Sequence, residues 1–225
     1  MSARMIVPLL FGLIGCGILL SLGTWQVQRL AWKQGVLAEI DAKIAATPVP
    51  LPSALSAMPM RYLPVEVSGD HTGEELHVLF SIKHQGAGYR VISKFVTSDG
   101  RTVLVDRGYV PTPRKDEDRA ATGVRLQGNL HWPDEVDSFT PNPDLANNIW
   151  FARDVDAMAD ALGTEPLLIV ARATSATTPA VQPVPVTTQG IPNDHLQYAI
   201  TWFLLCAAWA GMTAYLLWRI RQRTV

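Results

Sequence analysis

The sequence of 225 residues has 19 basic and 20 acidic side chains, a formal net charge of −1, and 48% hydrophobic residues. This near balance, without a basic run in the central part of the chain, excludes the electrostatic footprint of a nucleic-acid-binding protein. The two cysteines, Cys16 and Cys206, both lie in apolar stretches. The segment between those stretches therefore has no thiol for a disulfide or a thiolate metal site, which excludes copper transfer through paired cysteines.

The apolar stretches cover residues 5–22 and 196–218. Each approaches or exceeds the roughly 20 helical residues that cross a bilayer core, which predicts transmembrane helices at 5–24 and 196–218. A cleaved signal peptide is disfavoured because no small-residue cleavage site follows the first stretch. Lipid attachment at Cys16 is disfavoured because the apolar run continues past it. We therefore expect a two-pass membrane protein.

Basic residues flank the two predicted spans on the same side of the membrane: Arg4 before the first, and Arg219, Arg221 and Arg223 after the second. The positive-inside rule then predicts a cytoplasmic N-terminus at 1–4 and a cytoplasmic basic tail at 219–225. Because no Arg- and Ser-rich presequence precedes the first span, we expect a bacterial inner membrane. The intervening segment, about 170 residues long, is expected outside the cytoplasm and suits one compact domain.

The intervening segment is expected to begin as a helix and to continue as short strands. Residues 25–46 have helical spacing and precede a proline cluster, so they predict an amphipathic extension of the first span. Residues 47–172 contain short runs rich in β-branched and aromatic residues, separated by turn signals such as Ser68-Gly69-Asp70. These runs predict strands at 62–67, 76–80, 89–96, 102–105, 124–131 and 167–171.

Two further features complete the expected fold. Asp154 is expected to cap a short helix that runs through Leu162 and ends at Gly163. Residues 173–195, rich in Thr, Pro, Val and Gln, are expected to form an extended tether to the second span. The predicted fold class is an α+β membrane protein: two transmembrane helices flank a strand-rich extracytoplasmic domain, which is either an antiparallel sheet or a small barrel.

The outer segment carries no motif for hydrolysis or phosphate binding. A nucleophile elbow of the type Gly-x-Ser-x-Gly and a phosphate-cradling glycine loop are both missing from the sequence. A metal site would need clustered ligands: if His71 and His77 share a hairpin they are candidates, with His84 and His131 elsewhere, but isolated histidines on exposed strands and turns are usually surface residues.

The second predicted span has one helix face of chemical interest. At about 100° per residue, this face collects His195, Ala199, Trp202, Cys206, Trp209 and Thr213. An imidazole at a membrane surface is able to act as an axial haem ligand, a proton carrier or a headgroup contact. In the simpler interpretation, the tryptophans only pack and His195 is an interfacial polar residue. The small residues Gly17, Ser21, Ala207 and Gly211, each pair four apart, permit close contact between the spans.

If the spans pack together, Trp25, Gln26 and Arg29 reach the same membrane level as His195. Such a pocket suits a haem, because imidazole ligates iron, tryptophans flank an apolar macrocycle and arginine pairs with propionate carboxylates. The alternative for Trp25 and Arg29 is an aromatic belt with a snorkelling cation.

Three stretches resemble the signature sequences of the Surfeit locus protein 1 family. They are residues 23–33 (GTWQVQRLAWK), 103–111 (VLVDRGYVP) and 193–202 (NDHLQYAITW). Weaker similarity lies at 88–91 and at 148–150. Two positions depart from the family pattern: Tyr109 stands where tryptophan is usual, and Asp194 where asparagine is frequent. The resemblance extends over essentially the whole chain, including the two-span topology.

The resemblance implies a non-enzymatic factor for the assembly of cytochrome c oxidase, acting when haem a enters the largest oxidase subunit. Its implied partners are that subunit, a haem a synthase and the lipid bilayer. It implies His195 as the axial ligand of the haem iron, Trp25 and Trp202 as pocket walls, and Arg29 or Arg107 as counter-charges. A structural hydrogen bond in a turn is the alternative role for Arg107.

Two other functions remain compatible with the layout of span, outer domain and span. The first is a docking chaperone that stabilises an oxidase subunit without touching haem. The second is a polysaccharide chain-length regulator. A regulator of that class requires long outer helices, whereas the outer segment of this sequence predicts short strands.

Overall fold

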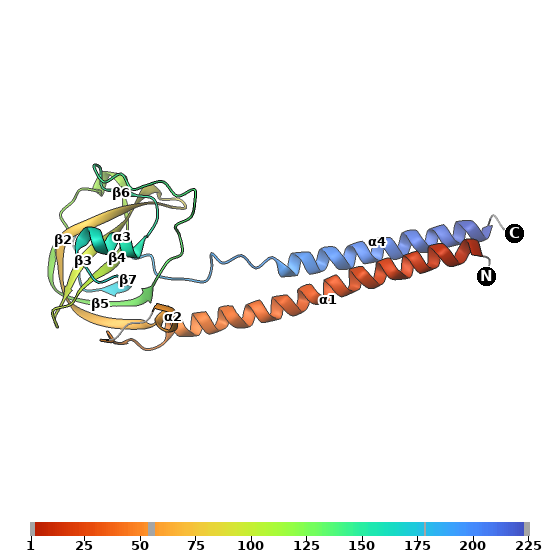
Figure 1. The fold of residues 1–225 in the computed structure, drawn as a ribbon, viewed down its shortest axis with the longest axis horizontal. Helices are drawn as coiled ribbons and strands as arrows, with labels where there is room; N and C mark the ends of the chain where they lie inside the picture. Colours follow the sequence, from red (N-terminus) through yellow and green to blue (C-terminus); the bar gives the residue numbers. More distant parts are fainter. Residues whose placement is uncertain (1–2, 54–56, 178, 223–225) are drawn as a thin grey trace. The chain divides into compact units, whose positions relative to one another are not determined.

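The computed structural model of the chain describes residues 3–53, 57–177 and 179–222 (Figure 1). These residues divide into two compact units. A helical unit contains the described residues up to Glu39 and from Thr188 onward, and a barrel unit contains those from Ile40 to Thr187.

The helical unit consists of α1 (Ala3–Ala45), whose last residues belong to the barrel unit, and α4 (His195–Gln222). The predicted span at 5–24 and the predicted extension at 25–46 form one continuous helix. Gly23, the one glycine near their junction, does not interrupt it. Both helices are long and apolar enough to cross a membrane.

The helix face of α4 that contains His195, Ala199 and Cys206, as predicted from helical spacing, packs on α1. Ala199 and Cys206 are its buried residues, and Cys206 Sγ lies 3.7 Å from the carbonyl oxygen of Cys16. Three larger side chains of α4 lie over glycines of α1: Phe203 over Gly23, Trp209 over Gly15 and Thr213 over Gly12.

The predicted contact through Gly17 and Gly211 is wrong, because a Cβ atom at either position meets nothing within 4 Å. The pattern of small residues four apart does not distinguish a glycine beneath a bulky partner from a glycine facing outward.

The barrel unit is strand-rich, as predicted, and its strands close on themselves. Hydrogen bonding follows the order β2-β3-β4-β7-β5, and β5 pairs again with β2. The domain is therefore a small barrel and not an open antiparallel sheet. Three pairings are parallel: β1 with β2, β6 with β2 and β4 with β7. The strands are β1 (Val49–Pro50), β2 (Pro64–Ile82), β3 (Gly86–Thr97), β4 (Thr102–Pro111), β5 (Ala121–His131), β6 (Ile149–Trp150) and β7 (Leu168–Thr174).

One long strand replaces two predicted ones. The runs at 62–67 and 76–80 both belong to β2, which pairs with β5 over its first part and with β3 over its second. Gly69 therefore marks a close approach of strands and not a turn, because a Cβ atom there would lie 2.1 Å from the carbonyl oxygen of Val96. The register shifts after His71, and Gly73 has a φ of +90°. This irregularity lets β2 bend from one neighbour to the other and close the barrel.

Two apolar clusters fill and cover the barrel. The first contains Val65, Phe95, Leu126 and Ile169. The second joins the outside of β2, β3, β4 and β7 to α3 (Val155–Leu162). Burying Met158 completely contributes roughly 1.5–3 kcal/mol. Two short helical turns, α2 (Ala57–Met60) and η1 (Thr112–Arg114), complete the unit.

The ends of α3 are as predicted. Asp154 Oδ1 accepts a hydrogen bond from the backbone N–H of Ala157 at 3.1 Å, and Gly163 ends the helix with a φ of +62°.

The segment after β7 has no regular secondary structure over most of its length, yet part of it contacts the barrel. Gln182 and Tyr109 exchange two backbone hydrogen bonds, of 2.7 and 3.0 Å. Val184 accepts a hydrogen bond from Arg90 Nη2 at 2.7 Å. Composition predicts that this segment is extended, whereas its attachment depends on β4 and β3, which are distant in sequence.

Candidate functional site

His195 is the first residue of α4. The helix begins here because Pro192 lies three residues earlier and the carbonyl oxygen of Asp194 accepts the first helical hydrogen bond, from Tyr198 at 3.1 Å. This position leaves the His195 ring half-buried at the helix start. The ring is held by a hydrogen bond to the neighbouring helix.

The partner of His195 is Gln26 of α1. His195 Nδ1 lies 2.8 Å from Gln26 Oε1, and the Gln26 side chain is only 8% exposed. An amide oxygen only accepts hydrogen bonds, so Nδ1 carries the proton in this contact, and in the neutral imidazole this tautomer has its lone pair on Nε2. A hydrogen bond of this kind commonly orients a histidine whose other nitrogen binds a metal.

Trp25 and Arg29 lie on other parts of the α1 surface. Trp25 is 53% exposed and points about 100° around the helix from Gln26. The Arg29 guanidinium lies over the ring of Trp32, 3.9 Å from its centroid, and is exposed. Among the described residues, neither Trp25 nor Arg29 forms a hydrogen bond or a ring contact with His195, so of the predicted pocket residues only Gln26 is joined to it in this way.

Trp202 lies on the same face of α4 as His195. It is half-buried, and seven residues of helix place it about 10 Å along the axis. The neighbouring Phe203 lies against Gly23 of α1. At this end of α4 the two helices meet through the polar contact of His195 with Gln26, and farther along through the Phe203 ring, which lies against Gly23.

Arg107 lies in the barrel unit, on β4. Its side chain is buried, and Nη1 donates a hydrogen bond to the carbonyl oxygen of Arg119 at 2.7 Å. Burial lowers the pKa of Arg107 from its ordinary value. His71 is also buried, and its burial, together with the positive charge of Arg107, lowers its pKa to about 3. Its imidazole is therefore neutral at pH 7, and its Nδ1 lies 2.8 Å from Ser93 Oγ.

The residue before Arg107 is the centre of a buried ionic network. Asp106 Oδ2 forms an ion pair with Arg90, whose Nε lies 3.0 Å away, and accepts a hydrogen bond from Arg153 Nη1 at 3.1 Å. Asp106 Oδ1 accepts from the backbone N–H of Gly108 at 3.1 Å, and Arg153 also pairs with Glu135. The stretch 103–111 therefore forms a structural node of the barrel.

The glycine in this stretch is required by its backbone. Gly108 has a φ of +114°, and a Cβ atom there would lie 2.0 Å from the carbonyl oxygen of Gln182. Tyr109, the departure from the family pattern, is buried, and its ring fits over Gly88.

The structure does not assemble the metal site considered for the outer histidines. Among the described residues, no three His, Cys, Asp or Glu side chains gather in the way a protein metal site requires. His71 instead contacts Ser93, and His77 Nε2 pairs with Glu75 Oε1 at 2.9 Å. A single imidazole on a haem iron is a different kind of site, to which this criterion does not apply.

Two contacts of the site were missed by reasoning from the sequence alone. The role of Gln26 as the partner of His195 was not predicted, although a glutamine between apolar helical residues is itself a signal of a polar contact. The network around Asp106 was also missed, because its members come from four separate segments.

Comparison with known proteins gives consistent matches. The model of the SURF1 family matches residues 13–207, which include all three signature stretches. The protein named Surfeit locus protein 1 of Rattus norvegicus is 35% identical over 221 residues, covering 88% of this chain and 70% of that protein. Its namesake of Homo sapiens is 35% identical over 211 residues, with 83% and 70% covered. A SURF1-like protein of Drosophila melanogaster is 29% identical over 214 residues, with 83% and 70% covered.

Proposed function

The chain belongs to the SURF1 family, and from this premise we propose that it assists the assembly of cytochrome c oxidase by holding haem a before the haem enters the largest oxidase subunit. In this proposal His195 Nε2 ligates the haem iron. The 2.8 Å contact between His195 Nδ1 and Gln26 Oε1 is the observation that carries the assignment.

The surroundings of His195 fit an apolar, anionic cargo of this kind. Trp202 lies on the same helix face, and Tyr198 and Phe203 leave apolar surface exposed nearby. Arg29 is exposed and is able to leave the Trp32 ring for a propionate carboxylate, since an exposed cation–π contact is worth only about 0.5–1 kcal/mol. Arg107, buried and hydrogen-bonded within the barrel, fits the structural role better.

An open site suits a carrier. His195 is half-buried and sits at a helix start, so a haem bound there keeps one edge accessible. A pocket that enclosed the porphyrin and ligated the iron on both faces would slow its release, because residence time depends on the contacts that must break.

We place α1 and α4 in a bacterial inner membrane, with both termini in the cytoplasm and the barrel unit on the extracytoplasmic side. The chain acts as a non-enzymatic chaperone in this proposal. Its partners are the largest oxidase subunit as client, a haem a synthase as haem source, and the bilayer.

The test compares pigment in three purified full-length proteins, each produced together with the haem a synthesis enzymes. We expect haem a in the wild type and in Gln28→Ala, whose side chain is exposed on α1, and little or none in His195→Ala. Thermal unfolding of all three proteins checks that each is folded. Full haem a occupancy in a folded His195→Ala protein contradicts the ligand assignment.

A second candidate function, a docking chaperone that does not touch haem, is favoured by one observation. Phe139 and Leu145 of the barrel unit are 90% and 72% exposed, which suits contact with a client protein. That function predicts a colourless protein even when haem a is being synthesised. The chain-length regulator receives no support, because α3, the longest helix between β1 and β7, has eight residues.

A further inference from the structure

The loop between β5 and α3 exposes an unusual amount of apolar surface. Besides Phe139 and Leu145, Val136 and Phe151 are also exposed. These four residues, together with the pocket described below, form what we call the docking surface. It lies within the barrel unit and has no part in the haem site proposed above.

The docking surface is held in one conformation by local hydrogen bonds. Asp137 Oδ1 accepts from the backbone N–H of Phe139 at 2.8 Å and from Thr140 Oγ1 at 3.0 Å. Farther along, Asp144 and Ile149 exchange two backbone hydrogen bonds of 2.9 Å. A partner that binds a fixed loop avoids the cost of ordering it, so the exposed side chains are already arranged for contact.

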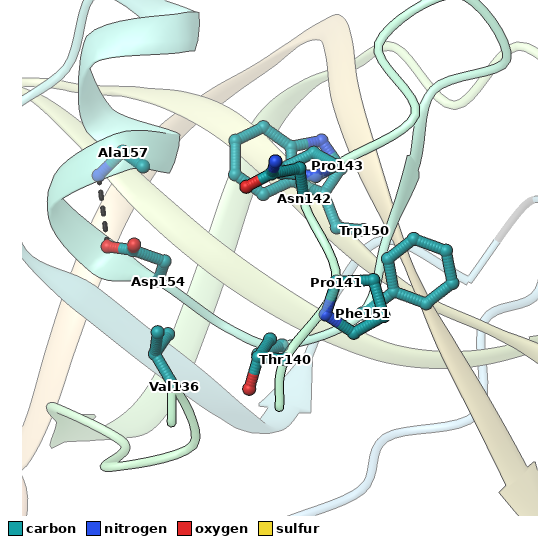
Figure 2. Close-up of a pocket in the computed structure, with 10 residues that line it drawn as sticks. Val136, Thr140, Pro141, Asn142, Pro143, Trp150, Phe151, Asp154 and Ala157 are labelled. Atoms are coloured by element: carbon teal, nitrogen blue, oxygen red, sulfur yellow. Dashed lines mark hydrogen bonds between the residues drawn. The ribbon is translucent and has the colours of Figure 1, made fainter. Parts of the chain in front are cut away.

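A pocket of about 130 Å³ lies between this loop and the start of α3 (Figure 2). The apolar walls of the pocket are formed by Val136, Pro141, Trp150 and Phe151. Asp154, which accepts a hydrogen bond from the backbone N–H of Ala157, lies at the N-terminus of α3. A cavity of roughly 150 Å³ accommodates a benzene-sized group, so this pocket suits one apolar side chain of moderate size.

Trp150 is the most buried wall of the pocket that the apolar core shares. Its side chain is 3% exposed, and its indole Nε1 has no hydrogen-bond partner among the described residues. A buried N–H without an acceptor is costly, and proteins rarely leave one in that state.

The surroundings of the pocket are acidic. Residues 132–162 contain seven Asp or Glu and one basic residue, Arg153, which is buried and paired with Glu135 and Asp106. The hydrogen bond from the backbone N–H of Phe139 lowers the pKa of Asp137, and the Asn147 side chain lowers the pKa of Asp144. Both carboxylates are therefore charged at neutral pH.

We propose that the docking surface binds a segment of a partner protein in which an aliphatic side chain, flanked by lysine or arginine residues, fills the pocket. The basic residues of that segment face the acidic rim. Charge complementarity identifies the occupant: an anionic lipid surface would be repelled by the same carboxylates.

The test uses the haem-free, full-length chain in phosphatidylcholine nanodiscs and a labelled peptide of sequence Lys-Leu-Lys-Leu-Lys. Fluorescence anisotropy should report binding that weakens with salt. Peptides with Glu in place of Lys, or Ser in place of Leu, should bind at least tenfold more weakly.

Variants of the chain distinguish specific binding of the peptide at the docking surface from non-specific binding to exposed apolar residues. Phe139→Ser is expected to weaken binding about tenfold, because it removes the most exposed apolar side chain of the docking surface. Val49→Ser is the matched control, because Val49 is an exposed apolar residue on β1, and it should change binding less than twofold.

Three results would overturn the proposal. The first is no peptide binding at millimolar concentration, or equal binding of the acidic peptide. The second is Phe139-dependent attachment to phosphatidylglycerol vesicles, which indicates a membrane-binding surface. The third is Phe139-dependent self-association, which indicates a second copy of the chain as occupant. Because the protein in this test carries no haem, its outcome is independent of the haem a proposal.

Discussion

Asp106 in the barrel unit and His195 in the helical unit differ in how many of their polar atoms have a partner. In the barrel, both carboxylate oxygens of Asp106 are paired: Oδ2 forms ion pairs with Arg90 and Arg153, and Oδ1 accepts a hydrogen bond from the backbone N–H of Gly108. In the helical unit, His195 uses Nδ1 for Gln26, and Nε2 has no partner among the described residues. A buried carboxylate that is paired through both oxygens stabilises a fold, whereas an imidazole with one nitrogen unpaired retains the capacity to bind.

The largest effect is expected where the barrel network is broken. Asp106→Ala would leave Arg90 and Arg153 buried without their shared carboxylate, which typically costs about 3–5 kcal/mol of unfolding free energy. Denaturant unfolding of the detergent-solubilised chain measures it, with Asp160→Ala, an exposed acidic residue of α3, as the control. Equal stability of the two variants would show that the network does not act as a structural unit.

The next effect concerns acid. His71 has a pKa of about 3 in the folded barrel against 6.5 for the free side chain, so the unfolded state binds the proton first. The stability contributed by neutral His71 is complete above pH 6.5 and is lost as pH falls toward 3. Between pH 6.5 and 5 the loss should reach about 2 kcal/mol. His71→Asn should flatten the measured dependence over this range, and an unchanged slope would reject the assignment to His71.

A smaller effect is expected at the helix contact. Gly23→Ala places a Cβ atom 2.6 Å from the Phe203 ring and should cost about 1 kcal/mol, whereas Gly17→Ala meets open space. The Gly17 variant should be neutral or slightly stabilising because alanine favours the helix. Thermal unfolding of the two variants compares them, and a more stable Gly23→Ala protein would contradict the packing.

The smallest effect on stability is expected from Arg29→Ala, at most about 1 kcal/mol, because its contact with Trp32 is exposed. If Arg29 pairs with a haem propionate, the same substitution should lower haem a occupancy far more than stability. Parallel measurement of both quantities separates the two roles. Unchanged occupancy would remove Arg29 from the haem site.

Local signals in the sequence predicted the local structure well. The two long helices, the cap of α3 at Asp154 and the strand-rich nature of the middle segment all follow from periodicity, capping and turn chemistry. The closure of the barrel did not follow. Gly69 carries the same signal whether it turns the chain or allows two strands to approach, and only the position of Val96 decides between them.

The candidate site was predictable in part. The helical spacing of His195, Ala199 and Cys206 correctly identified the face of α4 that packs on α1, because 3.6-residue periodicity fixes which side chains share a face. It did not identify the residue that would meet His195. That residue is Gln26 and not its neighbour Trp25, because one residue along a helix rotates the side chain by about 100°. The burial of the Arg107 side chain was also not predictable from the sequence, because it depends on β2 and on the segment near Arg119, which are distant in the chain.

The most direct measurement is rescue of haem a binding by free imidazole. The full-length His195→Ala protein, produced with the haem a synthesis enzymes, is purified with and without imidazole, and its optical spectrum is compared with the wild type. We predict haem a in the wild type, its loss in the variant, and recovery of a histidine-like spectrum when imidazole occupies the space of the missing ring. A folded variant that keeps wild-type haem a without imidazole would contradict the account.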